Sequence, residues 1–489
     1  MTEYKTVDNT KNIQTMINND TICALATAQG GALNVIRVSG SKAVEITASL
    51  FVPRNGKPLE ERKTHTVIFG DVFDVRGELL DEVLLTLMRG PRSYTGEDTV
   101  EISCHASSYI ARELLMNLIA KGARQAQPGE FTMRAFLNGK MDLSRAEAVA
   151  DVIASGSRAS HRLAMNQLKG GFSKELAQLH DKLLHLTTLM ELELDFSEED
   201  VDFADRTQLT ALCAEIEKVI ARLVDSFGIG NAMKNGIPVA IVGETNTGKS
   251  TLLNALLHED RAIVSDISGT TRDTIEGVMN IGGTTFRFID TAGIRVTTDI
   301  VEQMGIERTL DELSKCNIAL WVVDPTMDKE KIETAAKRLL PLCSGKKLCI
   351  VVNKCDATDS LTLSQAMDYA VALVGKYADG VEYDKENICA ISAKLGTNID
   401  RLQDFLLTAA ALPEISSDAV VVTNVRHYEA LCLALADIQR VQQAMRDGLP
   451  GDLVSEDLRQ CINHLSEIIG SVSSDSVLQN IFRNFCIGK

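Results

Sequence analysis

The residues Gly243-Glu-Thr-Asn-Thr-Gly-Lys-Ser250 carry the strongest chemical signal in the sequence. They follow the apolar run Val239 to Val242 and precede a stretch with helical character, Thr251 to Leu257. In such a strand–loop–helix context, glycines let backbone amides surround phosphate oxygens, a lysine reaches the β- and γ-phosphates, and a serine hydroxyl binds magnesium. The sequence therefore predicts a phosphate-binding loop in which Lys249 and Ser250 have these last two roles.

Three further motifs follow in chain order and indicate which nucleotide binds. Asp290-Thr-Ala-Gly293 ends a predicted strand, which suits Asp290 to the magnesium shell and the Gly293 amide to the γ-phosphate. Asn353-Lys-Cys-Asp356 ends another strand, and its aspartate can accept the two N–H donors that guanine presents and adenine lacks. Ser392-Ala-Lys394 can supply a backbone amide to the guanine oxygen. Together, the motifs predict a site for GTP and magnesium.

The residues that promote hydrolysis are less clear from the sequence. Ile294 follows Gly293 where Ras-like enzymes have a water-orienting glutamine, so hydrolysis needs another polar group and a cation in place of an arginine finger. Two roles fit Asn246: its amide oxygen coordinates a monovalent ion with carbonyls from Ser265 to Thr270, or it caps and shapes the loop. Glu302 has two roles open as well, in hydrolysis or as a solvated helix carboxylate.

Composition places the chain among folded, multidomain proteins. It has 489 residues, of which 45% are hydrophobic and 24% charged, with 9 prolines, so a largely disordered chain is excluded. At about 150 residues per domain, this length suggests roughly three domains. The formal net charge of −17 opposes nonspecific attraction to nucleic acid or an anionic membrane. A polyanionic substrate therefore requires a local basic patch or a basic partner.

Cysteine usage and hydropathy predict a cytoplasmic location. The 11 cysteines are scattered, without a Cys-x-x-Cys pair, as is typical of a protein in the reducing cytosol. The segment Met1 to Asp20 is polar, and no stretch approaches about 18 apolar residues. We therefore expect a protein without a membrane segment.

The pattern along the chain predicts a multidomain fold with α+β, all-α and α/β parts. We expect an α+β domain at 1–136, a helical domain in two parts at 137–236 and 413–489, and an α/β domain inserted at 237–412. A helix is expected from Ser108 to Ile119. An amphipathic helix is expected with Leu176, Leu179, Leu183, Leu186 and Met190 on one buried face. The expected strands are Leu33 to Val38, Val67 to Val72 and Val83 to Met88, and, in a parallel sheet, Val239 to Val242, Phe286 to Ile289, Ile318 to Val323 and Leu348 to Val352.

The chain as a whole resembles the MnmE (TrmE) family of tRNA modification GTPases, from Thr21 to Lys489. The G-domain motifs are similar to those of translation-factor-related GTPases. The remaining motifs that carry the resemblance are Thr21-Ile-Cys-Ala-Leu-Ala-Thr, Val35-Ile-Arg-Val-Ser-Gly40, Tyr94-Thr-Gly-Glu-Asp98, Pro128-Gly-Glu-Phe131, Arg134-Ala-Phe-Leu-Asn138, Asp195-Phe-Ser-Glu-Glu-Asp200 and Phe485-Cys-Ile-Gly-Lys489. The resemblance implies an α+β folate-binding and dimerisation domain, and a discontinuous helical domain with an inserted P-loop GTPase domain.

The resemblance also implies an activity. It implies a homodimer that hydrolyses GTP and forms a hetero-oligomer with a flavin-dependent MnmG-type partner. The complex adds an aminomethyl-type group to position 5 of the wobble uridine (34) of certain tRNAs. The implied one-carbon donor is 5-formyltetrahydrofolate or a related tetrahydrofolate, with Arg37, Glu101, Lys140 and Lys489 as its contacts. Cys486 is implied as a thiol required for modification, and a buried structural thiol is the alternative.

For the nucleotide site, the resemblance implies a complete set of residues. Ser250 and Thr271 are the implied magnesium ligands. The implied potassium ligands are Asn246, Ser265, Ile267 and Thr270. Asp290 and Glu302 are the expected catalytic residues of hydrolysis. The residues expected to bind the nucleotide and its ions are Gly243, Asn246, Thr247, Gly248, Lys249, Ser250, Thr251, Ser265, Ile267, Ser268, Gly269, Thr270, Thr271, Asp290, Thr291, Ala292, Gly293, Asn353, Lys354, Asp356, Ser392, Ala393 and Lys394.

Two other functions compete with this one. An Era-like ribosome-assembly GTPase explains the nucleotide motifs, but it needs an RNA-binding appendage such as a basic KH region. A folate-dependent one-carbon transferase with a regulatory GTPase domain shares the N-terminal evidence. Folate binding by residues 1–136 counts against the Era-like function.

Overall fold

The computed structural model describes residues 20–28, 30–196, 206–259, 275–290, 316–378, 387–410, 419–447, 449, 451–471, 475–483 and 485–488. The chain forms two compact units. One comprises Met1–Ile153, Gln167–Ile220 and Glu429–Lys489, and the other comprises Ala154–Asn166 and Ala221–Tyr428. Within the described ranges, no helix is both long and apolar enough to cross a membrane.

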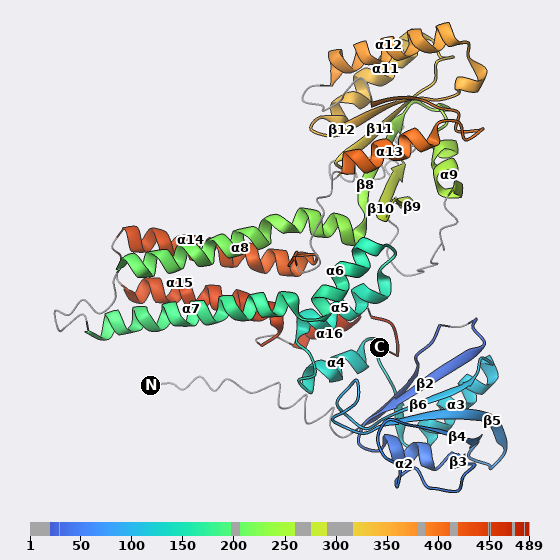
Figure 1. Ribbon diagram of the computed structural model, residues 1–489, viewed down its shortest axis with the longest axis vertical. Helices are drawn as coiled ribbons and strands as arrows, with labels where there is room; N and C mark the ends of the chain where they lie inside the picture. The colour runs from blue at the N-terminus through green and yellow to red at the C-terminus, as the bar shows by residue number, and fades with distance from the viewer. Residues whose placement is uncertain are drawn as a thin grey trace, which may run out of the picture. The chain divides into compact units, whose positions relative to one another are not determined.

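The first unit begins with a seven-stranded sheet in the order β3-β4-β5-β6-β2-β1-β7 (Figure 1). The strands expected around Leu33, Val67 and Val83 are confirmed as β2, β4 and β5. The strands are β1 (Thr21–Leu25), β2 (Leu33–Ser39), β3 (Phe51–Pro53), β4 (Thr66–Phe73), β5 (Leu79–Met88), β6 (Thr99–His105) and β7 (Ala123–Gln125). The helices of this part are α2 (Ala43–Ala48), α3 (Ser108–Ala120) and α4 (Glu130–Leu137).

The two faces of this sheet have different surroundings. One face buries a core that includes Ile36, Leu85 and Ile102, against which α3 packs through Leu114 and Leu118. On the other face, Phe131 of α4 covers Ile22 and Ala24 of β1. The part of that face formed by β4 and β5 leaves apolar side chains exposed, among them Val67, Phe69 and Leu84. Side chains alternate between faces along a strand, so Arg37 of β2 lies on this second face.

Long helices follow the N-terminal sheet in the chain, and they are divided between the two units, since Ala154–Asn166 and Ala221–Tyr428 belong to the second. The helical part of the chain comprises α5 (Leu143–Ala154), α6 (Arg158–Leu168), α7 (Gly171–Phe196), α8 (Arg206–Asn235), α14 (Val425–Arg446), α15 (Gly451–Ile469) and α16 (Asp475–Arg483). The apolar stripe expected on α7 is buried, from Leu176 at 1% exposure to Met190 at 4%. Helices from both sides of the inserted domain meet: Cys213 of α8 contacts Met445 of α14, and Gln439 and Gln442 of α14 donate to Glu217 of α8. The helical domain is therefore discontinuous, as expected.

The second unit contains a six-stranded sheet in the order β13-β12-β11-β8-β10-β9. All four expected strands are confirmed, and they are β8, β10, β11 and β12. The strands are β8 (Ile237–Gly243), β9 (Ile275–Ile281), β10 (Thr284–Asp290), β11 (Ile318–Val323), β12 (Lys347–Val352) and β13 (Ile388–Ala390). The helices are α9 (Lys249–Glu259), α11 (Lys329–Leu339), α12 (Ser360–Tyr377) and α13 (Ile399–Ala410), with short 3-10 helices η2 (Leu340–Cys343) and η3 (Cys355–Ala357).

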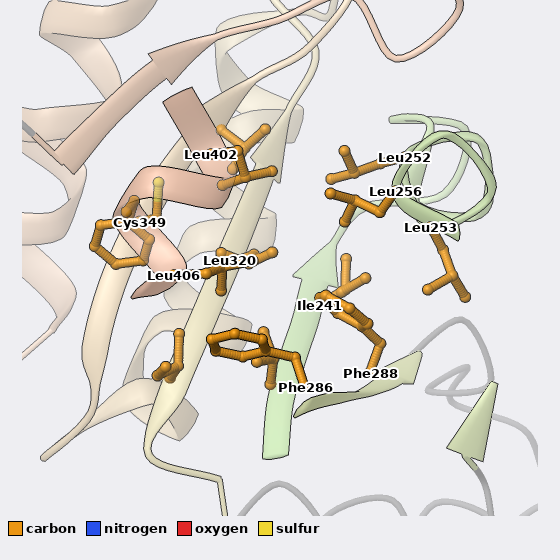
Figure 2. Close-up of a cluster of buried hydrophobic side chains, with 14 of the residues drawn as sticks. Ile241, Leu252, Leu253, Leu256, Phe286, Phe288, Leu320, Cys349, Leu402 and Leu406 are labelled. Atoms are coloured by element: carbon orange, nitrogen blue, oxygen red, sulfur yellow. The ribbon is translucent and has the colours of Figure 1, made fainter. Parts of the chain in front are cut away.

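Both faces of this sheet are buried because helices cover each of them. Ile241 and Leu320 face α9 and α13, where they pack with Leu256 and Leu406 (Figure 2). The alternate residues of the same strands, such as Trp321, face α11 and α12. This two-sided burial explains why the strands are continuous apolar runs in the sequence.

The sheet has an additional strand at one edge that was not among the expected strands. The sheet is parallel from β13 to β10, but β9 pairs antiparallel with β10. The two strands are joined through Gly282 and Gly283, which have φ values of 57° and 85°. A two-residue hairpin loop needs positive φ at these positions, and glycine adopts it without steric cost.

A close backbone contact between α8 and the segment before α14 gives a testable stability prediction. A Cβ at Gly230 would lie 2.1 Å from the Val422 carbonyl oxygen, whereas a Cβ at Gly228 meets nothing within 4 Å. Gly230→Ala therefore forces these segments apart, and we expect it to destabilise the protein by about 1–3 kcal/mol. Gly228→Ala, the matched control, should stabilise it by about 0.5–1 kcal/mol through helix propensity. Thermal unfolding followed by circular dichroism measures both, and equal effects would contradict the contact.

Candidate functional site

The phosphate-binding loop connects β8 to α9, as the sequence predicts. Lys249 is 7% exposed, and its Nζ donates to the carbonyl oxygens of Gly243 (3.0 Å) and Glu244 (2.9 Å). The Thr247 hydroxyl donates to the backbone carbonyl oxygen of Glu244 at 2.8 Å, and this bond closes the turn of the loop. The ammonium is thus held over the loop, where phosphate groups are bound in such motifs.

The segment after β12 is tied directly to this loop. Asn353 Nδ2 donates to the Thr247 carbonyl at 2.9 Å, and its Oδ1 accepts from the Ala393 amide at 3.0 Å. Lys354 Nζ donates to the Asn246 carbonyl at 3.0 Å. One asparagine therefore connects three predicted motifs that lie far apart in the sequence.

Asp356 has the charge that guanine recognition needs. A hydrogen bond from Ser392 lowers the pKa of Asp356, and Lys394 acts in the same direction. The carboxylate is therefore ionised at neutral pH and offers acceptors only. Ser392 is fully buried, and its hydroxyl accepts from the Leu395 amide at 3.2 Å, so the segment that faces Asp356 is fixed.

The fourth motif begins at the end of β10. Asp290 pairs in register with Ile241 of β8, so its backbone lies beside the strand that leads into the phosphate-binding loop. Ten of the residues expected to bind the nucleotide or potassium or to act in hydrolysis lie outside the described residues. They are Ser265, Ile267, Ser268, Gly269, Thr270, Thr271, Thr291, Ala292, Gly293 and Glu302. Asn246 has a φ of 63°, in the left-handed region that asparagine tolerates better than most residues.

The residues present fit GTP with magnesium. Ser250, the expected magnesium ligand, is the second residue of α9, and Thr251 follows it on the same helix. A hydroxyl oxygen at a helix N-terminus suits a hard cation bound to phosphate. Gly248 provides the close approach that the loop requires, since a Cβ there would lie 2.2 Å from Asn353 Nδ2.

A second group of predicted residues meets on the N-terminal sheet. Arg37 of β2 and Glu101 of β6 are paired in register, and Arg37 Nε donates to Glu101 Oε1 at 2.8 Å. The guanidinium carbon lies 5.6 Å from the ring centre of Tyr94 and 5.5 Å from that of Phe131. The Arg37 side chain is 15% exposed and Phe131 is fully buried, so the Arg37–Glu101 ion pair is partly enclosed and packs against aromatic rings.

Helix α4 holds the loop that carries Tyr94. The Thr132 hydroxyl is 2.9 Å from Tyr94 Oη, Asn138 Nδ2 donates to the Thr95 carbonyl at 2.8 Å, and Lys140 Nζ donates to the Pro91 carbonyl at 2.8 Å. Lys140, expected to contact folate, thus contacts the loop that bears Tyr94. Tyr94 and Phe131 belong to motifs of the family resemblance, and the sequence alone assigns neither of them a role. The signal available in the sequence was the aromatic character of these two residues.

The C-terminal tail reaches the same site. Arg37 Nη1 donates to the Gly488 carbonyl at 3.0 Å, and the Gly129 amide donates to the Cys486 carbonyl at 3.3 Å. Gly488 has a φ of 99°, and a Cβ there would lie 2.5 Å from the Leu25 carbonyl oxygen. The exposed Cys486 thiol is therefore held beside the N-terminal domain. Lys489 lies outside the described residues.

The α/β domain with these loops at the ends of its strands is a P-loop GTPase domain. Two family models match the chain: "GTP-binding protein TrmE N-terminus" over residues 21–140 and "MnmE helical domain" over residues 143–486. The chain belongs to the MnmE (TrmE) family.

Curated relatives named tRNA modification GTPase MnmE match nearly the whole chain. The protein of Bacteroides fragilis is 55% identical over 97% of this chain and 100% of its own length. The proteins of Phocaeicola vulgatus and Flavobacterium johnsoniae are 53% and 49% identical, with the same two coverages. Among solved structures, Aquifex aeolicus Era bound to GDP and AlF4⁻ is 28% identical over 41% of this chain and 66% of its own, with a TM-score of 0.26. Family membership rests on the sequence relatives.

Proposed function

We propose that this member of a tRNA modification GTPase family adds an aminomethyl-type group to position 5 of the wobble uridine (34) of certain tRNAs. In this proposal a tetrahydrofolate, such as 5-formyltetrahydrofolate, supplies the one-carbon unit. A flavin-dependent MnmG-type protein joins the chain in a hetero-oligomer and performs the redox chemistry. GTP hydrolysis drives a conformational change in the modification step.

The observation that carries the proposal is the partly enclosed Arg37–Glu101 ion pair, whose guanidinium lies near the rings of Tyr94 and Phe131. A folate has a flat pterin ring with N–H donors and an anionic glutamate tail. The partly exposed Tyr94 can contact the ring, a carboxylate such as Glu101 accepts its donors, and a guanidinium binds a carboxylate strongly. Lys140 and Lys489 add positive charge for the tail in this proposal. Bound folate supplies the one-carbon group, while these residues bind and orient it.

Binding of 5-formyltetrahydrofolate to the full chain tests the proposal. We expect Arg37→Met to weaken binding by about tenfold to a hundredfold because a charge-assisted bond to the ligand is lost. Isothermal titration calorimetry measures the affinity. Arg112→Met is a matched control, since Arg112 also lies over a tyrosine ring, Tyr109, and beside a glutamate, Glu113. Equal affinity of the wild-type and Arg37→Met chains would show that folate does not bind at Arg37.

We propose further that Asn246 binds potassium beside the phosphates, together with Ser265, Ile267 and Thr270, and that Glu302 positions water. The Asn246 side chain is exposed in the phosphate-binding loop, and its backbone is held by Lys354. A cation there takes the place of an arginine finger, an element worth about 10³ to 10⁵ in rate.

Potassium and sodium buffers of equal ionic strength distinguish this role from loop shaping. We expect potassium to raise the GTP hydrolysis rate by at least about tenfold, and Asn246→Ala to reduce that ratio towards one. Asn398→Ala is the control because Asn398 is another exposed asparagine with positive φ, at 57°. It should keep the ratio. A wild-type ratio near one would leave a GTPase activated by another group.

The homodimer is also part of the proposal. The exposed side chains Val67, Phe69 and Leu84 share the sheet face that carries Arg37 and Glu101. Exposed apolar patches of this kind are typical of protein–protein interfaces. We therefore place the dimer contact on this face. Size-exclusion chromatography with GDP and aluminium fluoride tests whether the dimer compacts further in the transition-state form.

The proposal also includes the domain boundaries, a cytoplasmic location and the role of Cys486. We propose domain boundaries at residues 136, 236 and 412. A cytoplasmic location is supported by free cysteines throughout the described residues. For Cys486, a role in modification is supported by its exposure, which a buried structural thiol would lack.

A further inference from the structure

Asp324 is a buried carboxylate next to the nucleotide site and outside every motif discussed so far. It directly follows β11 and is 4% exposed. Its Oδ1 accepts from the Thr326 amide (2.9 Å) and hydroxyl (2.7 Å), and its Oδ2 accepts from Lys354 Nζ at 2.5 Å. A buried charge is costly unless it is paired, so these bonds account for its stability in this position.

Lys354 connects this carboxylate to the phosphate-binding loop. Its ammonium donates to both Asp324 and the Asn246 carbonyl. Lys354 and Asn246 have φ values of 62° and 63°, in a region that residues other than glycine seldom adopt. One ammonium group therefore holds two strained backbone turns together, and Asp324 fixes the direction in which that group points.

The charge state of Asp324 agrees with this arrangement. Burial by itself would raise the pKa of Asp324, but hydrogen bonds from Lys354 and Thr326 hold the pKa below its usual value. The group is therefore an anion at neutral pH, and its bond to Lys354 is charge-assisted.

We propose that Asp324 is a positioning residue for guanine nucleotide binding, acting through Lys354 on the phosphate-binding loop. It does not touch the nucleotide. It holds the Lys354 ammonium against the Asn246 carbonyl. The predicted base-binding segment after β12 and the phosphate-binding loop therefore keep a fixed position relative to each other. Asn353 provides the second tie, to Thr247. The two ties together preorganise the loop before the nucleotide arrives.

Asp324→Asn is the decisive variant. It keeps the size of the side chain, but its amide group must face either the Lys354 ammonium or the Thr326 amide, and each of these is a donor. We expect the dissociation constants of GDP and GTP to rise by about tenfold or more. Asp328→Asn should change them by less than about twofold, since the Asp328 side chain is 80% exposed and its ion pair with Lys331 is 3.8 Å long.

A double-mutant cycle separates positioning from general damage to the fold. If Asp324 acts through Lys354, then adding Asp324→Asn to Lys354→Met should change nucleotide affinity by less than about twofold. Fluorescent guanine nucleotides measure the affinities, and circular dichroism measures the melting temperature of the nucleotide-free chains. Additive effects of the two substitutions, or wild-type affinity in Asp324→Asn, would overturn the proposal.

A milder variant tests the same idea if Asp324→Asn does not fold. Thr326→Val removes the 2.7 Å hydroxyl bond that orients the carboxylate and leaves the ion pair in place. We expect nucleotide affinity to fall by about two- to fivefold, with a smaller effect when Lys354→Met is present. Unchanged affinity in Thr326→Val with the loss of fold in Asp324→Asn would show that Asp324 is purely structural.

Discussion

Asp356→Asn should change the base that this GTPase accepts. In the predicted site, the ionised carboxylate accepts the two N–H donors of guanine, whereas an asparagine offers one acceptor and one donor. The new donor faces the exocyclic amino group of guanine, so we expect GTP affinity to fall by about a hundredfold or more. Xanthine has a carbonyl oxygen in place of that amino group, so XTP should bind better to the variant than to the wild-type chain.

Competition between GTP and XTP for a fluorescent nucleotide measures this change. Asp359→Asn is the matched control, because Asp359 is a nearby exposed aspartate that caps α12 by accepting from the Leu361 and Thr362 amides. Asparagine caps a helix almost as well as aspartate, so both affinities should stay at their wild-type values. If Asp356→Asn weakened GTP and XTP equally, the carboxylate would have a structural role and would not read the base.

Gly248→Ala should abolish nucleotide binding. Gly248 has a φ of 94°, and a Cβ there would lie 2.2 Å from Asn353 Nδ2. The added methyl group therefore strains the backbone and displaces the side chain that ties the phosphate-binding loop to the base-binding segment. We expect the dissociation constant of GTP to rise by at least about a hundredfold, and GTP hydrolysis to fall with it.

Gly345→Ala separates the two causes of this effect. Gly345 also has a positive φ, at 73°, but a Cβ there meets nothing within 4 Å. This variant should lose about 1–2 kcal/mol of stability from backbone strain and keep its nucleotide affinity. Nucleotide titration and thermal unfolding of both chains give the comparison. Wild-type affinity in Gly248→Ala would mean that the loop opens when the nucleotide binds.

The sequence predicts strands β2, β4 and β5 of the first sheet and β8, β10, β11 and β12 of the second, because their apolar patterns are continuous or alternating. It also predicts the nucleotide motifs, because backbone amides at loops and helix ends can bind phosphate only with certain residue types. The antiparallel β9 is different. Its pairing depends on the two-glycine turn at Gly282 and Gly283, and a local apolar pattern does not say which neighbour a strand chooses.

Local sequence alone therefore determined the class of nucleotide site, and it predicts Lys249 as the phosphate ligand and Asp356 as the residue that selects guanine. Only the tertiary structure decided which distant residues meet. Asn353 reaches Thr247 across 106 positions, and Arg37 reaches Gly488 across 451. Asp324 gains its place beside Lys354 because β11 and β12 are parallel neighbours whose ends meet at one edge of the sheet. Such contacts depend on strand order and helix packing, which many residues set together.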